Sequence, residues 1–588
     1  MIVNATLPAI AVILAYIAGY FLYSRFLARK VFKLRKEAIT PAHSENDGID
    51  FVPTNRYVLF GHHYASIAGL APMLGPAVAV IWGWLPALLW VTLGAIFIGC
   101  VHDFGSLVVS SRARGQSIGA VARGIIHPRA RLLFHIIILF LVALAMGVFV
   151  YVIAFLFSPA PNEANAAIHF PQAVTPSFGL IIIAAITGYL IYKRNISLKI
   201  LTPVGLILTL ALIGVSSYSH YGDWMGLGYV GKEGMAYSIK VWSGILLVYA
   251  LLASVLPVWS LLQPRDFLNS LLLYAGMIGL FIGFFIVQPE FVAPAVRLDV
   301  EGSPGLFPFV FIIIACGAAS GFHSLVASGT TARQLDKETD AQFIGYGGMI
   351  GESLLGFVAV LATTAGMTDH VSWENRYANW NAIQGLGAQV GVFIQGCSRF
   401  LEGVGIPQSV GASFISVIVV SYALTSLDSA TRLLRYNIEE IASFLNISWL
   451  QNRYPASILG IAFIAFFAYY EIDGKPAGLA LWALFGTTNQ ILAGLALLVI
   501  TIYLLKRGWQ WYIAGIPMVL LLGVTIHAMI EGIHGFIFRE GGIEWPLTII
   551  GTFLLILAVW LIVEAVLAVW RFKKRGILIE DYEVEEHH

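Results

Sequence analysis

Charged residues are scarce in this chain of 588 residues: Asp, Glu, Lys and Arg together make up 11 %, whereas hydrophobic residues make up 58 % and the mean hydropathy is +0.82. Soluble globular domains carry about 25 % charged residues, so a water-soluble body of this size could not cover its surface. The composition therefore excludes a soluble enzyme, a nucleic-acid-binding protein and a disordered scaffold. Because a spanning helix needs about 20 apolar residues, we expect an all-α protein that crosses the lipid bilayer many times.

Cysteine is scarce too: Cys100, Cys316 and Cys397 lie far apart, and no Cys-x-x-Cys pair occurs. Thiolate metal sites, iron–sulfur clusters and disulfide scaffolds therefore have no support. The sequence also lacks the G-x-x-x-x-G-K-[ST] and H-E-x-x-H motifs, so neither ATP hydrolysis nor zinc proteolysis is indicated. We expect a protein that is not an enzyme and holds no cofactor.

Apolar runs bounded by charges or by Gly and Pro turns predict about fifteen transmembrane helices. Their approximate bounds are 5–26, 57–81, 84–111, 132–157, 177–193, 198–217, 239–262, 267–288, 307–329, 343–366, 408–431, 455–470, 478–503, 510–530 and 546–570. The stretch 387–405 is too short and too interrupted to span, and predicts an interfacial or re-entrant helix.

The basic residues are strongly asymmetric across these spans. When the loops are assigned alternately to two sides, 27 of the 34 Lys and Arg fall on one side and 7 on the other. Cytoplasmic loops carry the excess of Lys and Arg, so the N-terminus is predicted outside and the C-terminus inside. One missed span would invert every later loop and destroy the asymmetry.

Two predicted spans contain helix breakers. Span 57–81 has Gly69, Pro72, Gly75 and Pro76 within ten residues, and span 239–262 has Pro257 in its interior. Non-helical backbone at membrane depth persists only where it is buried in protein or lines a watery cavity. The second of these spans is the fifth after the first, so the two cross the membrane in opposite directions. This pattern predicts an inverted repeat of five plus five helices, and with it a midplane substrate site; proline kinks that merely aid packing are the alternative.

Several segments resemble the carbon starvation protein A family. They are FGHHYASIAGLAPMLGPA (60–77), VHDFGSLVVSSRARGQSIG (101–119), ASVLPVWSLLQPRDFL (253–268), GAASGFHSLVASGTTARQ (317–334), LTSLDSATRLLRYNIEE (424–440) and LFGTTNQILAGL (484–495). The resemblance extends from about residue 5 to 530. It implies a prokaryotic inner-membrane carrier with a LeuT-like inverted-repeat core, used when carbon runs out and linked to uptake of peptides or, in some members, of pyruvate.

The predicted organisation has three parts. Residues 1–56 hold an extra span and a cytoplasmic basic loop, 57–440 form the ten-helix transport core, and 441–588 hold additional spans and a cytoplasmic tail. The expected partners are a small peptide or pyruvate, a coupling H⁺ or Na⁺ and the lipid bilayer, with no nucleic acid; the oligomeric state is left open.

Ionisable and hydroxyl side chains inside spans are the candidates for ion or proton coupling, because such groups are costly in the membrane and usually functional. Asp103 is the strongest, since a buried carboxylate changes charge when a cation or salt-bridge partner arrives; capping of freed backbone is its alternative, and Glu352 has a similar profile. The set comprises Asp103, His102, His62, His63, Ser320, His323 and Ser324. Ser320, Ser324 and Ser328 recur every four residues and predict one hydroxyl stripe, on what we count as the eighth core helix, suited to Na⁺ or simply to helix packing.

Residues at the two breaks are the candidates for substrate binding. Free N–H groups at half-helix starts suit a carboxylate, and adjacent aromatic side chains suit a peptide. The set comprises Gly69, Ala71, Pro72, Gly75, Tyr64, Ser254, Pro257, Trp259 and Ser260.

Two further groups complete the predictions. Asp428 and Arg432 are four residues apart, so an intrahelical pair with a structural or gating role is expected. Asn489 and Gln490 are suited to hydrogen bonds between helices outside the core. A membrane haem or metal redox protein using His62, His63, His102, His135 or His323 is the alternative from a different functional class.

Overall fold

The computed structural model describes residues 3–161, 168–218, 231–383, 385–539 and 542–575. In that part of the chain, twelve helices are long and apolar enough to cross a membrane, or thirteen when the bent pair Arg56–Ile67 and Ala71–Trp82 is counted. The chain is thus an all-α, multi-pass membrane protein, as predicted.

The helices of the described residues follow one another along the chain in the following order. The first half contains a continuous helix Thr6–Val31 (opened by α1, Thr6–Ala18), α3 (Pro41–Ser44), α4 (Arg56–Ile67), α5 (Ala71–Ala79), a continuous helix Trp84–Arg112 that comprises α6 (Trp84–Leu89), a π-helical stretch Trp90–Gly99 and α7 (Cys100–Arg112), then α8 (Ile118–Ile125), α9 (Pro128–Phe157), α10 (Val174–Arg194), α11 (Leu198–Tyr218), α13 (Gly231–Val255) and α14 (Leu262–Val287). The second half contains α15 (Leu306–Ile313), α16 (Gly321–Val326), a π-helical turn Ala327–Thr331, α17 (Ala332–Gln334), the helix Glu338–Thr364 with α18 (Gly347–Thr364), α19 (His370–Arg376), α20 (Leu386–Glu402), α21 (Gln408–Phe444), α22 (Arg453–Tyr469), a two-stranded hairpin of β1 (Glu471–Ile472) and β2 (Lys475–Pro476), α23 (Ala477–Ala480), α24 (Ala483–Lys506), α25 (Tyr512–Ile537) and α26 (Trp545–Arg575).

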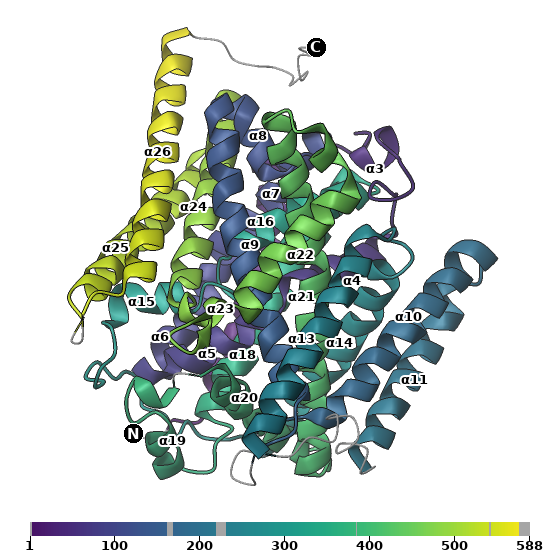
Figure 1. The fold of residues 1–588 in the computed structure, drawn as a ribbon, viewed down its shortest axis with the longest axis vertical. Helices are drawn as coiled ribbons and strands as arrows, with labels where there is room; N and C mark the ends of the chain where they lie inside the picture. Colours follow the sequence, from purple (N-terminus) through teal and green to yellow (C-terminus); the bar gives the residue numbers. More distant parts are fainter. Residues whose placement is uncertain (1–2, 162–167, 219–230, 384, 540–541, 576–588) are drawn as a thin grey trace.

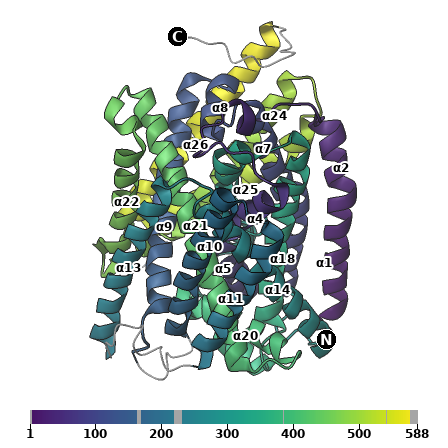
Figure 2. The same cartoon turned by 90° about the vertical axis from the view of Figure 1, so that its right-hand side faces the viewer.

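The two ends of the chain lie on opposite sides of the bundle. Helix α1 begins at the bottom of Figure 2, where the N-terminus is marked, and α26 ends at the top in both Figure 1 and Figure 2. The chain therefore crosses the bundle an odd number of times. The two predicted spans absent from the thirteen fall on the 17-residue helix Arg453–Tyr469 and on the interrupted segment 306–334, so the total of fifteen stays a prediction.

The second broken helix is not where the sequence placed it. Pro257 lies between two full-length helices, because α13 ends at Val255 and α14 begins at Leu262. The prediction of a break inside span 239–262 was wrong; its prolines end one helix and start the next, which is where the missing amide costs least. The second interruption lies instead in 314–320, between α15 and α16.

Helix contacts in the first half of the chain recur between corresponding helices of the second half. Helix α4 packs on α14 as α16 packs on α24, and α9 packs on α13 as α21 packs on α22. In the same way α9 contacts α22 and α13 contacts α21, with α9 and α21 in contact at the centre. We infer that an inverted repeat relates the five helices from α4/α5 to α14, with α10 and α11 inserted, to the five from α15–α17 to α24. The predicted division at residue 440 would separate α22 and α24 from helices on which they pack.

The additional helices lie outside this bundle. Figure 1 shows α10 and α11 on one flank and α25 with α26 on the other. In α11, Ile200, Ile207 and Val215 are more than half exposed, as expected for a surface that faces lipid. Helix α20, predicted as interfacial, is a 17-residue helix that packs on α5, α18 and α21 at the end of the bundle where α19 lies (Figure 1).

Candidate functional site

The first interruption separates α4 from α5 by a bend of 46°. Pro72 occupies the first turn of α5, where proline loses no helical hydrogen bond. A Cβ on Gly69 would lie 2.5 Å from Ser426 Oγ, and one on Gly75 would lie 2.3 Å from the carbonyl oxygen of Ile313. Glycine at these two positions therefore lets α21 and the end of α15 approach the break, so the two interrupted segments touch.

The second interruption is held by side chains of α24. The Phe322 amide donates to Asn489 Oδ1 at 2.9 Å, and Gln490 Nε2 donates to the carbonyl of Phe311 at 2.8 Å. Asn489 and Gln490 thus satisfy backbone groups that the break frees, inside the bundle rather than outside it. Gly317, with φ +90°, takes a conformation that side-chain-bearing residues rarely adopt.

A chain of alternating acids and imidazoles joins the second interruption to its neighbours. His102 Nδ1 lies 2.7 Å from Asp103 Oδ1, and Asp103 Oδ2 lies 2.9 Å from His323 Nδ1. His323 Nε2 lies 3.2 Å from Glu352 Oε2, whose other oxygen accepts from the Gly317 amide at 3.1 Å. All four side chains are fully buried. Such carboxylates need protons or cations to remain in a dry interior, and an imidazole can pass a proton between its two nitrogens.

The adjacent histidines of α4 face different neighbours, as their 100° separation predicts. His62 Nδ1 lies 2.5 Å from Asp266 Oδ2 of α14, and His63 Nδ1 lies 2.8 Å from Thr331 Oγ1. The Nε2 atoms of both are buried and have no hydrogen-bond partner.

A second buried charged group lies between α14, α13 and α21. Arg265 forms an ion pair with Asp428, and Tyr249 donates to the same carboxylate at 2.6 Å. The predicted intrahelical pair of Asp428 with Arg432 was therefore wrong, because each finds its partner on another segment. Arg432 Nη1 donates to Asp50 Oδ1 at 2.6 Å.

Asp50 belongs to the loop before α4 and accepts hydrogen bonds from Arg432 and Arg435 of α21. Burial alone would raise its pKa, but the guanidinium groups of Arg432, Arg435 and Arg333 outweigh burial and hold the pKa below its ordinary range. The neighbouring Ile49 carbonyl accepts from the Val258 amide at 3.1 Å. This loop therefore stays negatively charged and tied to the turn between α13 and α14.

Aromatic side chains line the space between α4, α14 and α21. The rings of Tyr64 and Tyr274 stack with centroids 5.6 Å apart, and Tyr422 meets Tyr64 edge-on at 6.3 Å. The hydroxyls of Tyr274 and Tyr422 are buried without a hydrogen-bond partner.

The structure gathers only part of the predicted substrate set. Gly69, Ala71, Pro72, Gly75 and Tyr64 lie at the first interruption. Ser254, Pro257, Trp259 and Ser260 do not: Ser254 Oγ meets Ser457 Oγ at 2.9 Å, Ser260 caps the Pro257 carbonyl, and Trp259 lies under Lys193 of α10. These four residues belong to the end of α13 and the turn after it.

The predicted hydroxyl stripe was also wrong at one position. Ser320 is extended, with φ −120° and ψ 130°, because it precedes α16. Ser324 donates to the Gly321 carbonyl and Ser328 to the Ser324 carbonyl. The hydroxyls that contact the first interrupted helix come instead from Thr331, which meets His63, and from α21, where Ser429 Oγ meets Ser66 Oγ at 2.7 Å.

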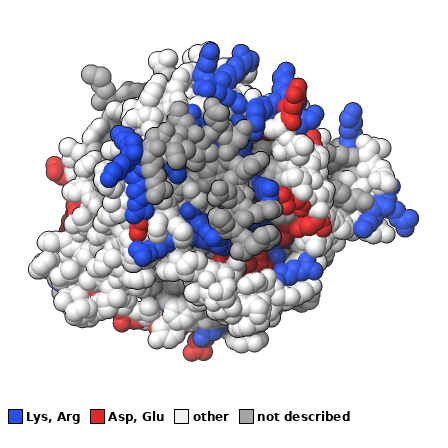
Figure 3. Space-filling model, turned by 90° about the horizontal axis from the view of Figure 1, so that it is seen from above, with Lys and Arg blue, Asp and Glu red and all other residues white. Residues whose placement is uncertain are grey.

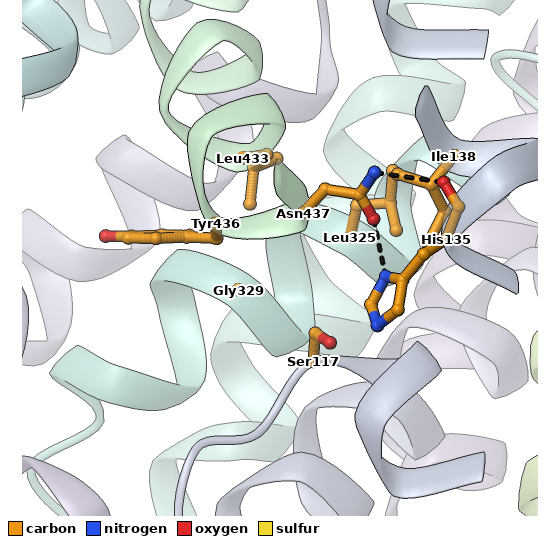
Figure 4. Close-up of a pocket in the computed structure, with 8 residues that line it drawn as sticks. All are labelled: Ser117, His135, Ile138, Leu325, Gly329, Leu433, Tyr436 and Asn437. Carbon is orange, nitrogen blue, oxygen red and sulfur yellow. Dashed lines mark hydrogen bonds between the residues drawn. The ribbon is translucent and has the colours of Figure 1, made fainter. Parts of the chain in front are cut away.

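A separate small cavity of about 20 Å³ lies beside His135 (Figure 4). That volume holds about one water molecule. His135 bonds to Asn437 at 2.5 Å and to Glu440 at 2.7 Å, so this histidine serves packing between α9 and α21. The cavity is lined by Ser117, His135, Ile138, Leu325, Gly329, Leu433, Tyr436 and Asn437.

Sequence reasoning missed the charged residues of α14. Arg265 and Asp266 fall between two predicted spans and read as loop residues, yet both are fully buried. The available signal was an adjacent basic and acidic pair at the edge of an apolar run, next to a proline that can start a helix.

The fold defines the class: a multi-pass membrane protein built around two interrupted helices that touch. A family model described as "Carbon starvation protein CstA" matches residues 4–387 and 369–528. The chain therefore belongs to the CstA family, which confirms the resemblance.

The chain is similar to several named proteins over most of its length. A Campylobacter jejuni protein named "Peptide transporter CstA" is 31 % identical and covers 90 % of this chain and 80 % of its own length. An Escherichia coli protein named "Pyruvate/proton symporter BtsT" is 31 % identical over 90 % of this chain and 81 % of its own. A solved Eremococcus coleocola manganese transporter covers 90 % of this chain and 99 % of its own at 12 % identity, with a TM-score of 0.46.

Proposed function

We propose that this protein is a proton-coupled secondary transporter that imports short peptides across the cytoplasmic membrane by alternating access of its two repeats. The observation that carries the proposal is the buried chain from His102 through Asp103 and His323 to Glu352, which links the second interrupted helix to helices on both sides. Relatives named peptide transporters support the substrate class.

The coupling step follows from the charges of that chain. Two carboxylates share it with two imidazoles, so each added proton changes how strongly 306–334 is held to α7 and α18. Proton entry from outside and release inside would alternate those contacts and drive a conformational change. Oxygen ligands suit Na⁺ better than imidazoles do, so this site favours H⁺.

The orientation proposed for import places the basic end in the cytoplasm. Lys and Arg gather on the face seen in Figure 3, the end of the bundle where α3 and α8 lie. The excess of basic residues on that side supports an N-terminus outside and a C-terminus inside.

The test is uptake of labelled alanyl-alanine into proteoliposomes with pH and Na⁺ gradients imposed separately. A pH gradient alone should drive accumulation, and Asp103→Asn should abolish accumulation while leaving exchange of peptide for peptide intact. Accumulation driven only by Na⁺, or unchanged in Asp103→Asn, would contradict the proposed coupling.

Pyruvate or another small monocarboxylate is the second candidate substrate. The relative named a pyruvate/proton symporter and the buried guanidinium of Arg265 favour it. Competition separates the two: excess di- and tripeptides should suppress labelled pyruvate uptake little if pyruvate is the substrate, and labelled peptide should then not accumulate.

A further inference from the structure

The Arg265–Asp428 ion pair lies where the first interrupted helix meets α14 and α21. Asp266, next to Arg265, contacts His62 of α4, and Ser429, next to Asp428, contacts Ser66. On both α14 and α21, the residue that follows the ion-paired one therefore contacts the last turns of α4. Both side chains have no exposed surface.

Stability does not account for this pair. Desolvation of two charges offsets their attraction, and a hydrophobic replacement is often at least as stable as a buried ion pair. The pair is also incompletely satisfied, since Arg265 Nε and Asp428 Oδ1 have no hydrogen-bond partner. Buried polar atoms of this kind usually have partners, so both charges retain bonding capacity for a further group.

More unpartnered polar atoms follow the same interface between α14 and α21. Asn269, one turn from Arg265, donates to Thr425 Oγ1 at 3.1 Å, but its Oδ1 accepts nothing. The Ser421 and Tyr422 hydroxyls of α21 are likewise buried without partners. Donors and acceptors of this kind can bond the amide groups of a peptide.

We infer that Arg265 and Asp428 form a specificity site that reads the two charged ends of a zwitterionic substrate; this inference rests on the proposed transport function. The substrate carboxylate takes the place of Asp428 on Arg265, and the substrate ammonium takes the place of Arg265 on Asp428. A free peptide with both ends charged thus exchanges one buried ion pair for two. A monocarboxylate would satisfy Arg265 alone and leave Asp428 as an uncompensated charge, which is costly.

The test measures uptake of alanyl-alanine, of its N-acetyl form and of its C-terminal amide by proteoliposomes. The unaltered protein should prefer the free dipeptide over each blocked form by about tenfold or more, because a site built for a polar group rejects an analogue that lacks it. Asp428→Asn should lose the preference against the N-acetyl form, and Arg265→Gln should lose the preference against the amide.

A double variant separates a change in specificity from a loss of folding. Arg265→Gln with Asp428→Asn removes both charges together, so no single buried charge is left, and it should transport all three compounds with similar efficiency. The matched control is Arg112→Gln with Glu338→Gln, an ion pair of 2.5 Å that joins α7 to the segment after α17, which should keep the preference of the unaltered protein.

The outcomes separate this inference from the proposed function. Peptide uptake by the unaltered protein with the same preference in all Arg265 and Asp428 variants would overturn the specificity site and leave peptide transport standing. Pyruvate uptake without any peptide uptake would overturn both.

Discussion

The two buried charged networks differ in the groups that compose them. The chain through Asp103 and His323 is built of carboxylates and imidazoles, which can each gain or lose a proton, whereas the second network also contains a guanidinium that stays charged. Every member of the first chain can therefore bind or release a proton, whereas Arg265 in the second network can only change the charged group with which it pairs. This difference is why we propose proton coupling at the helices around 306–334 and substrate recognition at the α14–α21 interface.

Removal of an imidazole from the chain through Asp103 and His323 tests the proposed difference between the two networks most directly. His323→Gln should abolish accumulation under a pH gradient, a loss of about tenfold or more, because glutamine cannot carry a proton between Asp103 and Glu352. Proteoliposome uptake measures this. His135→Gln is the matched control, since His135 is also buried and paired with an acid, and it should retain coupling. Equal loss in both variants would contradict a specific role for the chain.

The next largest effect concerns stability. Asp428→Asn alone should destabilise the protein by about 3–5 kcal/mol, because it leaves Arg265 buried and unpaired. The double variant with Arg265→Gln should recover most of that loss. Thermal unfolding of the purified protein, followed by circular dichroism, checks both. A double variant as unstable as the single one would mean that the pair is chiefly structural.

A substitution at the contact of the two interrupted segments should have a smaller effect. Gly75→Ala should cost up to about 3 kcal/mol, because the added methyl meets the Ile313 carbonyl and the backbone must shift. Gly523→Ala is the control, since a Cβ there would meet nothing within 4 Å. The melting temperatures of the two variants give the comparison, and equal values would argue against a tight contact.

The smallest expected effect is at the basic end. Because the pKa of Asp50 lies below its ordinary value, its ion pairs contribute stability above the unfolded pKa of about 3.9 and lose it as the pH falls through the folded pKa. Asp50→Asn should lower stability by only about 1 kcal/mol, equally at pH 5 and pH 8, because the asparagine oxygen can still accept from Arg432, which also keeps its bonds to the Ala253 and Leu256 carbonyls. A difference that grows between those pH values would contradict the depressed pKa.

Much of the architecture was predictable because it depends on the residue types within short segments of the sequence. The break at Gly69–Pro72 and the divergence of His62 from His63 both follow from residues close in sequence. The second break was misplaced because Gly317 and its neighbours carry no proline at the interruption; side chains of α24, more than 160 residues later, hold it open. The partners of Asp428 and Arg432 could not be predicted either, since an i,i+4 pair competes with any charge that another helix brings nearer.

Composition and hydropathy were enough to predict a multi-pass membrane protein and the position of most of its apolar segments. Each of these properties depends only on whether a segment of about 20 residues is apolar enough to lie in lipid. Only the tertiary structure decided which buried acid meets which base, because in a medium without water a charge takes its partner from whichever helix packs beside it.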